Sequence, residues 1–271
     1  MRGQDHLPIG VFDSGIGGLT VLGVIHKTLP GESTMYLGDT ARVPYGTKSP
    51  EVVTRYALNN ARFLVQRGIK LLVVACNTAS AVALPALEEA LEVPVVGVIR
   101  PGARKAARTT RSGVVGVIGT EGTIMSGSYE RELLKVRPDA TVFKRPCPLF
   151  VPLAEEGWED HQVSKAVAGE YLGDFASEGM DTLILGCTHY PVLRGPIQSA
   201  VGDGVTLVDS ATAVAEVVAE ELDRLGLTCK GGGPPAHEFF VTDVPQRFQT
   251  VGERFLGAPL AGIRQVDIDP H

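Results

Sequence analysis

Two cysteines, Cys76 and Cys187, have sequence surroundings that suit acid–base chemistry. Each ends an apolar stretch typical of a buried strand, KLLVVAC (70–76) and DTLILGC (181–187), and each precedes Thr or Asn-Thr and a predicted helix. At such a position the N–H groups and the positive end of the following helix stabilise a thiolate. The same N–H groups bind a carboxylate. The pattern therefore predicts two reactive thiols beside an anionic ligand.

Two thiols in equivalent settings indicate a two-base reaction rather than a single nucleophile. A stereocentre that is inverted loses its proton to a base on one face and regains one on the other. A thiolate and a thiol that exchange roles with direction can do this. Because a free thiol has a pKa of about 8.5, modest help from neighbouring groups makes it a usable base near neutral pH.

Acidic and imidazole side chains near these thiols are candidates to assist them. Asp13, in the first glycine-rich turn, is the candidate for Cys76. His189 is the candidate for Cys187, as is one of two adjacent acids, Glu155 or Glu156. A buried cysteine is more often only a small hydrophobic residue. That is our interpretation of the other two cysteines, Cys147 and Cys229, which lack the strand–Thr–helix context.

Composition narrows the class of protein. The 271 residues are 44% hydrophobic and 21% charged, with a net charge of −6, which is ordinary for a soluble α/β protein and argues against a nucleic-acid partner. No apolar run has transmembrane length and the N-terminus lacks a signal-peptide core, so we expect a cytoplasmic protein without a membrane partner. The cysteines form no C-x-x-C pair and the six histidines no H-x-x-x-H pair, so we expect no metal site.

Strands and helices alternate along the chain, which predicts mostly parallel sheets covered by helices. A helix over 49–68 has Ser49 as its cap and Pro50 in its first turn, and a second helix over 78–91 is expected to be kinked at Pro85. A further helix runs from about Val163 to Glu178, another opens at 188–201, and a strand at EFFVTD with a Pro245-started helix closes the chain.

The strand–loop pattern occurs twice and indicates an internal duplication. FDSGIGG (12–18) aligns with IGTEGT (118–123), and VVACNTAS (73–80) aligns with LILGCTHYP (183–191). We therefore expect an α/β fold of two pseudo-symmetric, doubly wound, mostly parallel-sheet domains. The active site should lie between them, at the carboxyl ends of the strands.

Two glycine-containing segments do not match the known phosphate- or nucleotide-binding motifs that they partly resemble. DSGIGG (13–18) fails the dinucleotide pattern because Thr20 stands where its last glycine belongs. The same loop has Gly15 where haloacid-dehalogenase-type phosphatases need a second aspartate. YGTKS (45–49) lacks the spacing of a phosphate-binding P-loop.

The chain resembles bacterial glutamate racemases through a series of motifs in the family's order. These are FDSGIGGLTV (12–21), YLGDTARVPYG (36–46), ACNTAS (75–80), PVVGVI (94–99), IGTEGT (118–123), CPLFVPLAEEG (147–157), LGCTHYP (185–191) and VDSA (208–211). The resemblance implies a cofactor-independent racemase that supplies D-glutamate for peptidoglycan. It also implies a first domain of 1–98 plus 208–271 and a second of 99–207.

The resemblance further assigns roles to residues. Cys76 would take the α-proton of D-glutamate and Cys187 that of L-glutamate, with Asp13, His189 and Glu155 (or its neighbour Glu156) assisting. Substrate-binding or supporting positions would be Asp13, Ser14, Tyr45, Gly46, Asn77, Thr78, Thr120, Thr123, Thr188 and His189.

Two other functions remain open from the sequence. A related two-thiol enzyme, such as an aspartate racemase, would share the mechanism but not the substrate. A two-lobed binding protein would hold an anionic ligand without catalysis, although binding alone needs no pair of bases. The family resemblance also favours a homodimer.

Overall fold

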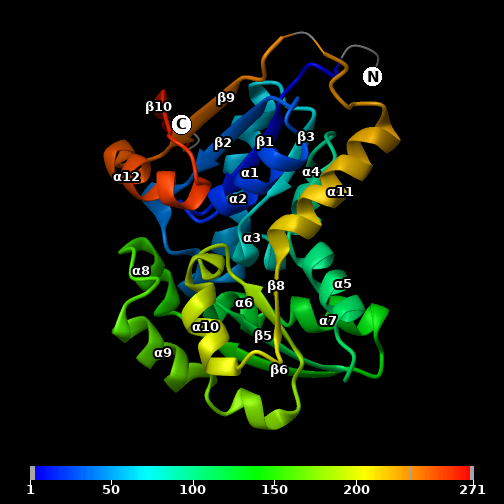
Figure 1. Ribbon diagram of the computed structural model, residues 1–271. Helices are drawn as coiled ribbons and strands as arrows, with labels where there is room; N and C mark the ends of the chain where they lie inside the picture. Colours follow the sequence, from blue (N-terminus) through cyan, green and yellow to red (C-terminus); the bar gives the residue numbers. More distant parts are fainter. Residues whose placement is uncertain (1–3, 232, 269–271) are drawn as a thin grey trace.

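The computed structural model describes residues 4–231 and 233–268, without the side chains of 176 and 177, and shows two lobes that each contain one parallel sheet (Figure 1). The larger sheet has the strand order β10-β9-β2-β1-β3-β4 and the smaller one β6-β5-β7-β8. The order β2-β1-β3-β4 thus recurs as β6-β5-β7-β8, and all strand pairs in the described residues are parallel. This confirms the predicted α/β class with two similar sheets.

The strands are short, and β1, β2, β3 and β7 are buried along their whole length, as expected of parallel sheets covered on both faces. Their bounds are β1 Ile9–Asp13, β2 Thr34–Gly38, β3 Leu71–Val74, β4 Val95–Gly97, β5 Val114–Gly119, β6 Thr141–Pro146, β7 Thr182–Gly186, β8 Thr206–Asp209, β9 His237–Val241 and β10 Ile263–Gln265.

Helices connect the strands and cover both faces of each sheet. Their bounds are α1 Leu19–Thr28, α2 Pro50–Gln66, α3 Asn77–Val82, α4 Leu84–Ala90, α5 Ile99–Thr109, α6 Glu121–Met125, α7 Ser128–Val136, α8 Phe150–Glu155, α9 Gln162–Leu172, α10 Arg194–Val201, α11 Ser210–Leu225 and α12 Pro245–Leu256. Short 3-10 turns are η1 Thr40–Arg42, η2 Tyr45–Thr47, η3 Phe175–Glu178 and η4 Tyr190–Leu193.

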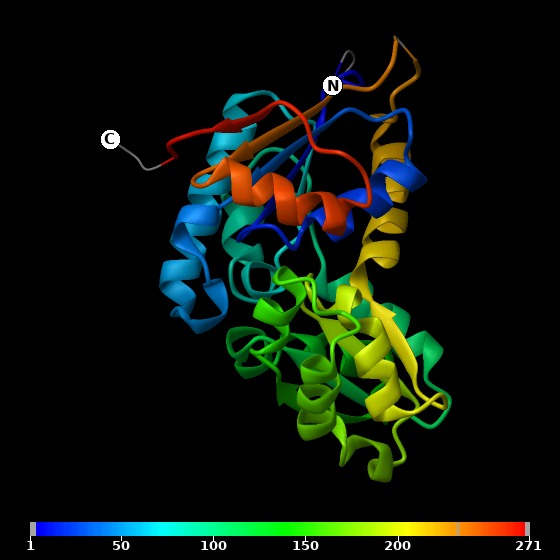
Figure 2. The same ribbon diagram turned by 60° about the vertical axis from the view of Figure 1, so that its left-hand side comes forward.

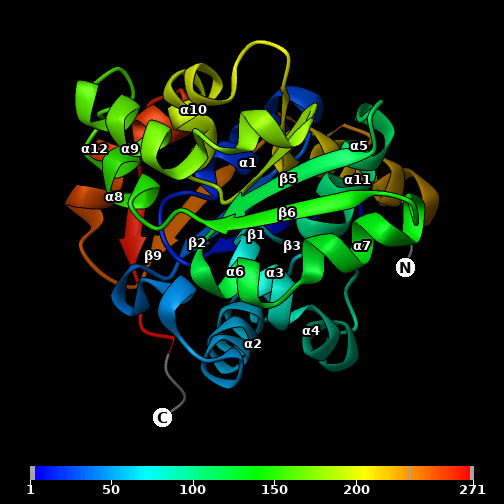
Figure 3. The ribbon, with the colours of Figure 1, turned by 90° about the horizontal axis from the view of Figure 1, so that it is seen from below.

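Apolar packing follows this layering. One buried cluster joins the first sheet to α2, α3 and α4, and another joins the second sheet to α5 and α7. The largest cluster runs from α1, α11 and α12 over to the α9–α10 face of the second sheet, so it is shared by both lobes. Figure 2 shows α11 leaving the second lobe and running along the first. Figure 3 shows the strands β5 and β6 of the second sheet from below.

Several predicted element bounds are corrected by the structure. The helix predicted over 49–68 is confirmed as α2, with the Ser49 side chain accepting from the Val52 N–H. The helix predicted over 78–91 is instead two helices, α3 and α4, which meet at Ala83 just before Pro85. Proline removes a backbone donor from the helical ladder, which explains the break.

The structure differs from the predicted elements at three further places, two in the second lobe and one near the C-terminus. The helix predicted over 163–178 ends at Leu172 and is followed by the separate turn η3. The segment predicted to form one helix over 188–201 begins with η4, whose second residue is a proline, and only then forms α10. Strand β10, not predicted, adds an edge to the first sheet beside β9.

The described residues contain no helix with both the length and the apolar character that a membrane crossing requires. The chain passes between the lobes twice, once from β4 into α5 and once from β8 into α11. The strands β1, β3, β5 and β7 end at Asp13, Val74, Gly119 and Gly186, which places their following loops at the junction of the lobes.

Candidate functional site

A cavity of about 360 Å³ lies at this junction, within the size range of small-molecule sites. It is formed by the loops that follow the central strands of both sheets, as ligand sites in open α/β sheets usually are. Its lining is Ser14, Gly15, Ile16, Val43, Pro44, Tyr45, Gly46, Thr47, Cys76, Asn77, Thr78, Thr120, Glu121, Pro148, Val151, Pro152, Glu155, Cys187, Thr188 and His189.

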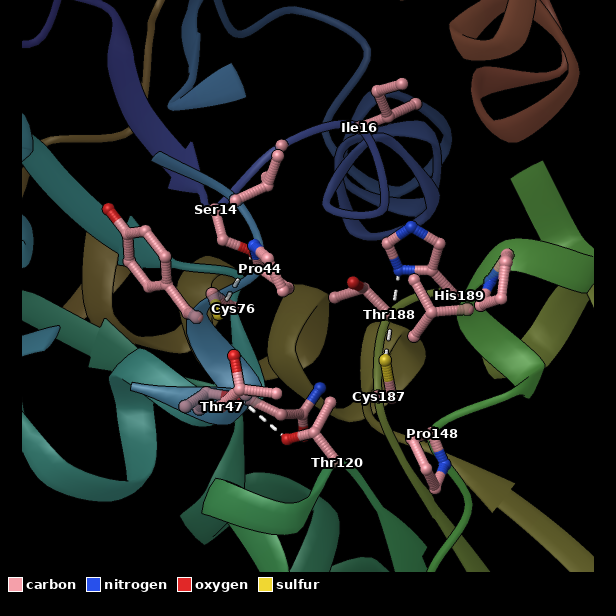
Figure 4. A pocket seen from close by; sticks show the side chains of 18 of the residues that line it. Ser14, Ile16, Pro44, Thr47, Cys76, Thr120, Pro148, Cys187, Thr188 and His189 are labelled. Carbon is pink, nitrogen blue, oxygen red and sulfur yellow. Dashed lines mark hydrogen bonds between the residues drawn. The ribbon is translucent and has the colours of Figure 1, made fainter. Parts of the chain in front are cut away.

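The two cysteines enter the cavity from different lobes and lie on opposite sides of it (Figure 4). Cys76 follows β3 and Cys187 follows β7, the equivalent strand of the second sheet. Both are buried, with 5% and 7% of their surface exposed. A small ligand between them would therefore have one sulfur on each side.

Cys76 lies at the N-terminus of α3. Its Sγ accepts from the Ala79 N–H at 3.5 Å and lies 3.6 Å from Ser14 Oγ. Burial and the negative charge of Asp13 nevertheless raise the pKa of Cys76 to about 12, against the lowering effect of its hydrogen bonds with Ala79 and Ser14. Cys76 is therefore a protonated thiol near neutral pH.

Cys187 has a different partner, because the short turn η4 follows it instead of an α-helix. The Sγ of Cys187 lies 3.8 Å from Nδ1 of His189, and Nε2 of His189 lies 3.2 Å from Oε1 of Glu155. Figure 4 shows the His189 ring directly above the Cys187 sulfur. This row of three groups is suited to hold an imidazolium between two anions.

The charge of His189 decides what Cys187 can do. Burial opposes an imidazolium, but hydrogen bonds to Cys187 and Glu155 and the charges of Cys187 and Asp13 outweigh it, so the pKa of His189 rises to about 10. The His189 partnership in turn lowers the pKa of Glu155. The imidazolium thus places a positive charge 3.8 Å from the Cys187 sulfur.

Asp13 and Thr123, both predicted as substrate-side residues, do not line the cavity. Asp13 is fully buried below the glycine-rich loop, where its Oδ2 accepts from the Gly15 N–H at 2.9 Å. Burial raises the pKa of Asp13, with the charge of His189 opposing this. Asp13 therefore influences both Cys76 and His189 through its charge rather than by direct contact with the cavity.

Threonine hydroxyls join the two lobes at the floor of the cavity. Thr78 of the first lobe lies 2.9 Å from Thr120 and 3.3 Å from Thr123 of the second, measured between Oγ1 atoms. Gly46 packs against Thr120 so closely that a Cβ there would lie 2.6 Å from the Thr120 Cβ. The predicted binding residues of both lobes are thus brought together, with Thr123 behind the other two threonines.

Tyr45 contributes to the wall but keeps its hydroxyl away from a ligand. The hydroxyl donates to Asp39 and accepts from Asn60 Nδ2 at 3.0 Å. Asp39 also pairs with Arg42 at 2.9 Å. The Tyr45 side chain therefore fixes the loop that carries Val43 and Gly46, and its hydroxyl is not a free donor.

Sequence reasoning missed two parts of the site. Arg247, on α12, lies 3.1 Å from Oε2 of Glu155 and so holds the carboxylate that contacts His189. Arg247 and Glu155 are separated by 92 positions in the sequence, so no local pattern predicts that they pair. The second part is an apolar wall of Val43, Pro44, Pro148, Val151 and Pro152, whose residues stood inside recognised motifs.

The structure also separates the two candidate acids. Glu155 contacts His189, whereas the side chain of Glu156 is 59% exposed and lies 3.8 Å from Arg247.

Comparison with known proteins agrees with this geometry. Residues 9–218 match the family model described as Asp/Glu/Hydantoin racemase. The glutamate racemase of Geobacter metallireducens is 58% identical over 264 residues, which cover 96% of this chain and 97% of that protein.

Two solved structures have nearly the same fold as this chain. The glutamate racemase isoform RacE1 of Bacillus anthracis superposes with a TM-score of 0.93 at 42% identity, over 97% of this chain and 98% of that one. The glutamate racemase of Francisella tularensis, solved in complex with D-glutamate, gives 0.92 at 39% identity, over 98% and 99%. The chain belongs to the Asp/Glu/Hydantoin racemase family.

Proposed function

We propose that this protein interconverts L-glutamate and D-glutamate by moving the α-proton between two thiols, without a cofactor. The observation that carries the proposal is the placement of Cys76 and Cys187 at equivalent strand ends on opposite sides of one cavity. The names of the relatives, glutamate racemases at up to 58% identity, support glutamate as the substrate. The product D-glutamate would supply peptidoglycan synthesis.

The thiol pair would work with unequal starting states. Cys187, beside the His189 imidazolium, is the thiolate that removes the α-proton of L-glutamate. Cys76, whose pKa is about 12, is the thiol that donates a proton to the opposite face. In the reverse direction a Cys76 thiolate removes the α-proton of D-glutamate and the Cys187 thiol donates, so the two cysteines exchange roles.

The remaining predicted residues would bind the substrate or support the thiols. Hydroxyl, amide and backbone donors around the cavity fit the two carboxylates of glutamate, because neutral donors satisfy carboxylates without a fixed counter-charge. We assign direct binding to Ser14, Gly46, Asn77, Thr78, Thr120 and Thr188. Supporting roles go to Asp13, Tyr45, Thr123, His189 and Glu155.

We also propose that the lobes are domains made of 1–98 with 208–271, and of 99–207. The separate sheets support this division, although β8 extends to Asp209. Following the family resemblance, we propose a homodimer that acts in the cytoplasm. Light scattering of the purified protein would test the dimer, and a monomeric mass would contradict it.

Circular dichroism of D-glutamate with purified protein and no added cofactor tests the function. We expect the signal to decay to zero. Decay with D-aspartate but not D-glutamate would keep the two-thiol mechanism and overturn the substrate. The absence of decay with either amino acid would favour a binding protein.

A further inference from the structure

Tyr129, on α7 of the second lobe, contacts a sequence neighbour of each cysteine. Its hydroxyl donates to Oδ1 of Asn77 at 2.7 Å, and Asn77 directly follows Cys76. Its ring packs against Gly186, which directly precedes Cys187. A Cβ on Gly186 would lie 3.0 Å from Cε2 of the ring. Tyr129 is 2% exposed and does not line the cavity, so it reaches a ligand only through these neighbours.

The hydrogen bonds at Tyr129 have a defined direction. The hydroxyl has one proton, which it donates to Asn77 Oδ1. Ser210 Oγ, 2.9 Å away, must then be the donor to the Tyr129 oxygen. Ser210 is the first residue of α11, where the chain returns to the first lobe. The row Ser210–Tyr129–Asn77 thus links the returning helix, the second lobe and the first lobe.

This row fixes the orientation of the Asn77 amide. An amide whose oxygen accepts on one side presents its Nδ2 donors on the other, and Asn77 lines the cavity. With the opposite orientation, Asn77 would offer a carboxylate ligand an acceptor instead of a donor. With the Tyr129 proton donated to Oδ1, the Asn77 Nδ2 group remains to donate to a carboxylate in the cavity.

We propose that Tyr129 is a positioning residue for racemisation, which holds the Asn77 amide with its donors toward the substrate carboxylate. This inference rests on the proposed function. It also assigns Tyr129 a second effect, since the same ring supports the backbone from which Cys187 emerges. One side chain thereby keeps the two thiol loops in a fixed relation across the junction of the lobes.

A double-mutant cycle in the full-length protein tests the proposal. Tyr129→Phe retains the ring and removes the hydroxyl. We expect kcat/KM for glutamate to fall about twofold to twelvefold, the range that follows from the usual net contribution of one hydrogen bond. In an Asn77→Ala background, the same substitution should change kcat/KM less than about twofold, because its target is gone.

The control cycle pairs Tyr190→Phe with Asn77→Ala. Tyr190 is equally buried and belongs to the same lobe, and its hydroxyl donates to the backbone oxygen of Cys147 at 2.8 Å. Because it has no link to Asn77, its effect on kcat/KM should be the same in both backgrounds. If Tyr129→Phe does not fold, Ser210→Ala replaces it in the cycle and should show the same loss of effect in the Asn77→Ala background.

The outcomes separate this inference from the proposed function. Additive effects of Tyr129→Phe and Asn77→Ala, or a Tyr129→Phe variant as active as wild type, would overturn the positioning role and leave racemisation intact. A wild-type chain that does not racemise glutamate would overturn the function and, with it, this inference. A Tyr129→Phe effect that disappears without Asn77 would support it.

Discussion

Replacing Glu155 by Gln should move the pH dependence of catalysis, because Glu155 maintains the charge of His189. The carboxylate lies 3.2 Å from His189 Nε2, and a hydrogen bond between charged groups contributes about 1.5–3 kcal/mol. At about 1.36 kcal/mol per pKa unit, its loss lowers the pKa of His189 by about one to two units. The Glu155 side chain is 24% exposed, so solvent screening favours the smaller value.

The direction of the effect follows from which form of His189 is active. The imidazolium supports the Cys187 thiolate, so activity is retained below the His189 pKa of about 10 and lost as the pH rises through it. In Glu155→Gln the basic limb of the kcat/KM profile should therefore move to lower pH by about one to two pH units. Polarimetric or circular-dichroism assays between pH 6 and 11 would measure this.

Glu156→Gln is the matched control. It removes the same charge one residue away, from a side chain that is 59% exposed and contacts Arg247. Its profile should overlay that of the wild type. A Glu155→Gln profile with an unmoved basic limb, or an equal movement in both variants, would refute the role given to the Glu155–His189 pair.

Three further substitutions probe the packing and charge that support the site. Gly17→Ala should lower kcat/KM by about 100-fold, since the new Cβ would lie 2.2 Å from Thr188 Oγ1 and 2.5 Å from His189 Nδ1, and displacements near 1 Å have that effect; wild-type kinetics would contradict this. Tyr45→Phe should lower the free energy of unfolding by about 1–3 kcal/mol in urea denaturation, because Oδ2 of the buried Asp39 carboxylate loses the Tyr45 hydroxyl donor; an unchanged midpoint would count against it. Burial and His237 lower the pKa of His26 to about 4. Below pH 6.5 the folded state therefore binds fewer protons than the unfolded state, so the free energy of unfolding should fall as the pH falls from 6.5 to 4. We expect a decrease of roughly 1 kcal/mol, a value reduced because His26 is partly exposed to solvent. His26→Gln should flatten this dependence, and an equal slope would refute the assignment.

The sequence was informative where local pattern reflects burial or chain geometry. Apolar stretches before Cys76 and Cys187 identified β3 and β7, and the repeated loops indicated two similar sheets. Ser49 and Pro50 located the start of α2, because a cap and a first-turn proline act within a few residues. Such signals depend only on near neighbours in the chain.

Contacts between distant segments were not predictable from pattern. Arg247 meets Glu155 only because α12 packs near the second lobe, and Tyr129 reaches Asn77 across 52 residues. The two thiol loops also differ more than their sequences indicate. The helix α3 begins directly after Cys76, whereas Cys187 is followed by the short turn η4, which begins at Tyr190. The two sulfurs therefore have different charged neighbours, Asp13 for Cys76 and His189 for Cys187.

Incorporation of solvent deuterium tests the two-thiol mechanism most directly. The proton on the donating Cys76 thiol exchanges with solvent, so conversion of L-glutamate in D₂O should place deuterium at the α-carbon of the first D-glutamate formed. The L-glutamate that remains should stay unlabelled at early times, and either Cys76→Ala or Cys187→Ala should abolish conversion. Product that retains the original α-proton, or conversion that persists in either variant, would contradict proton transfer between two opposed thiols.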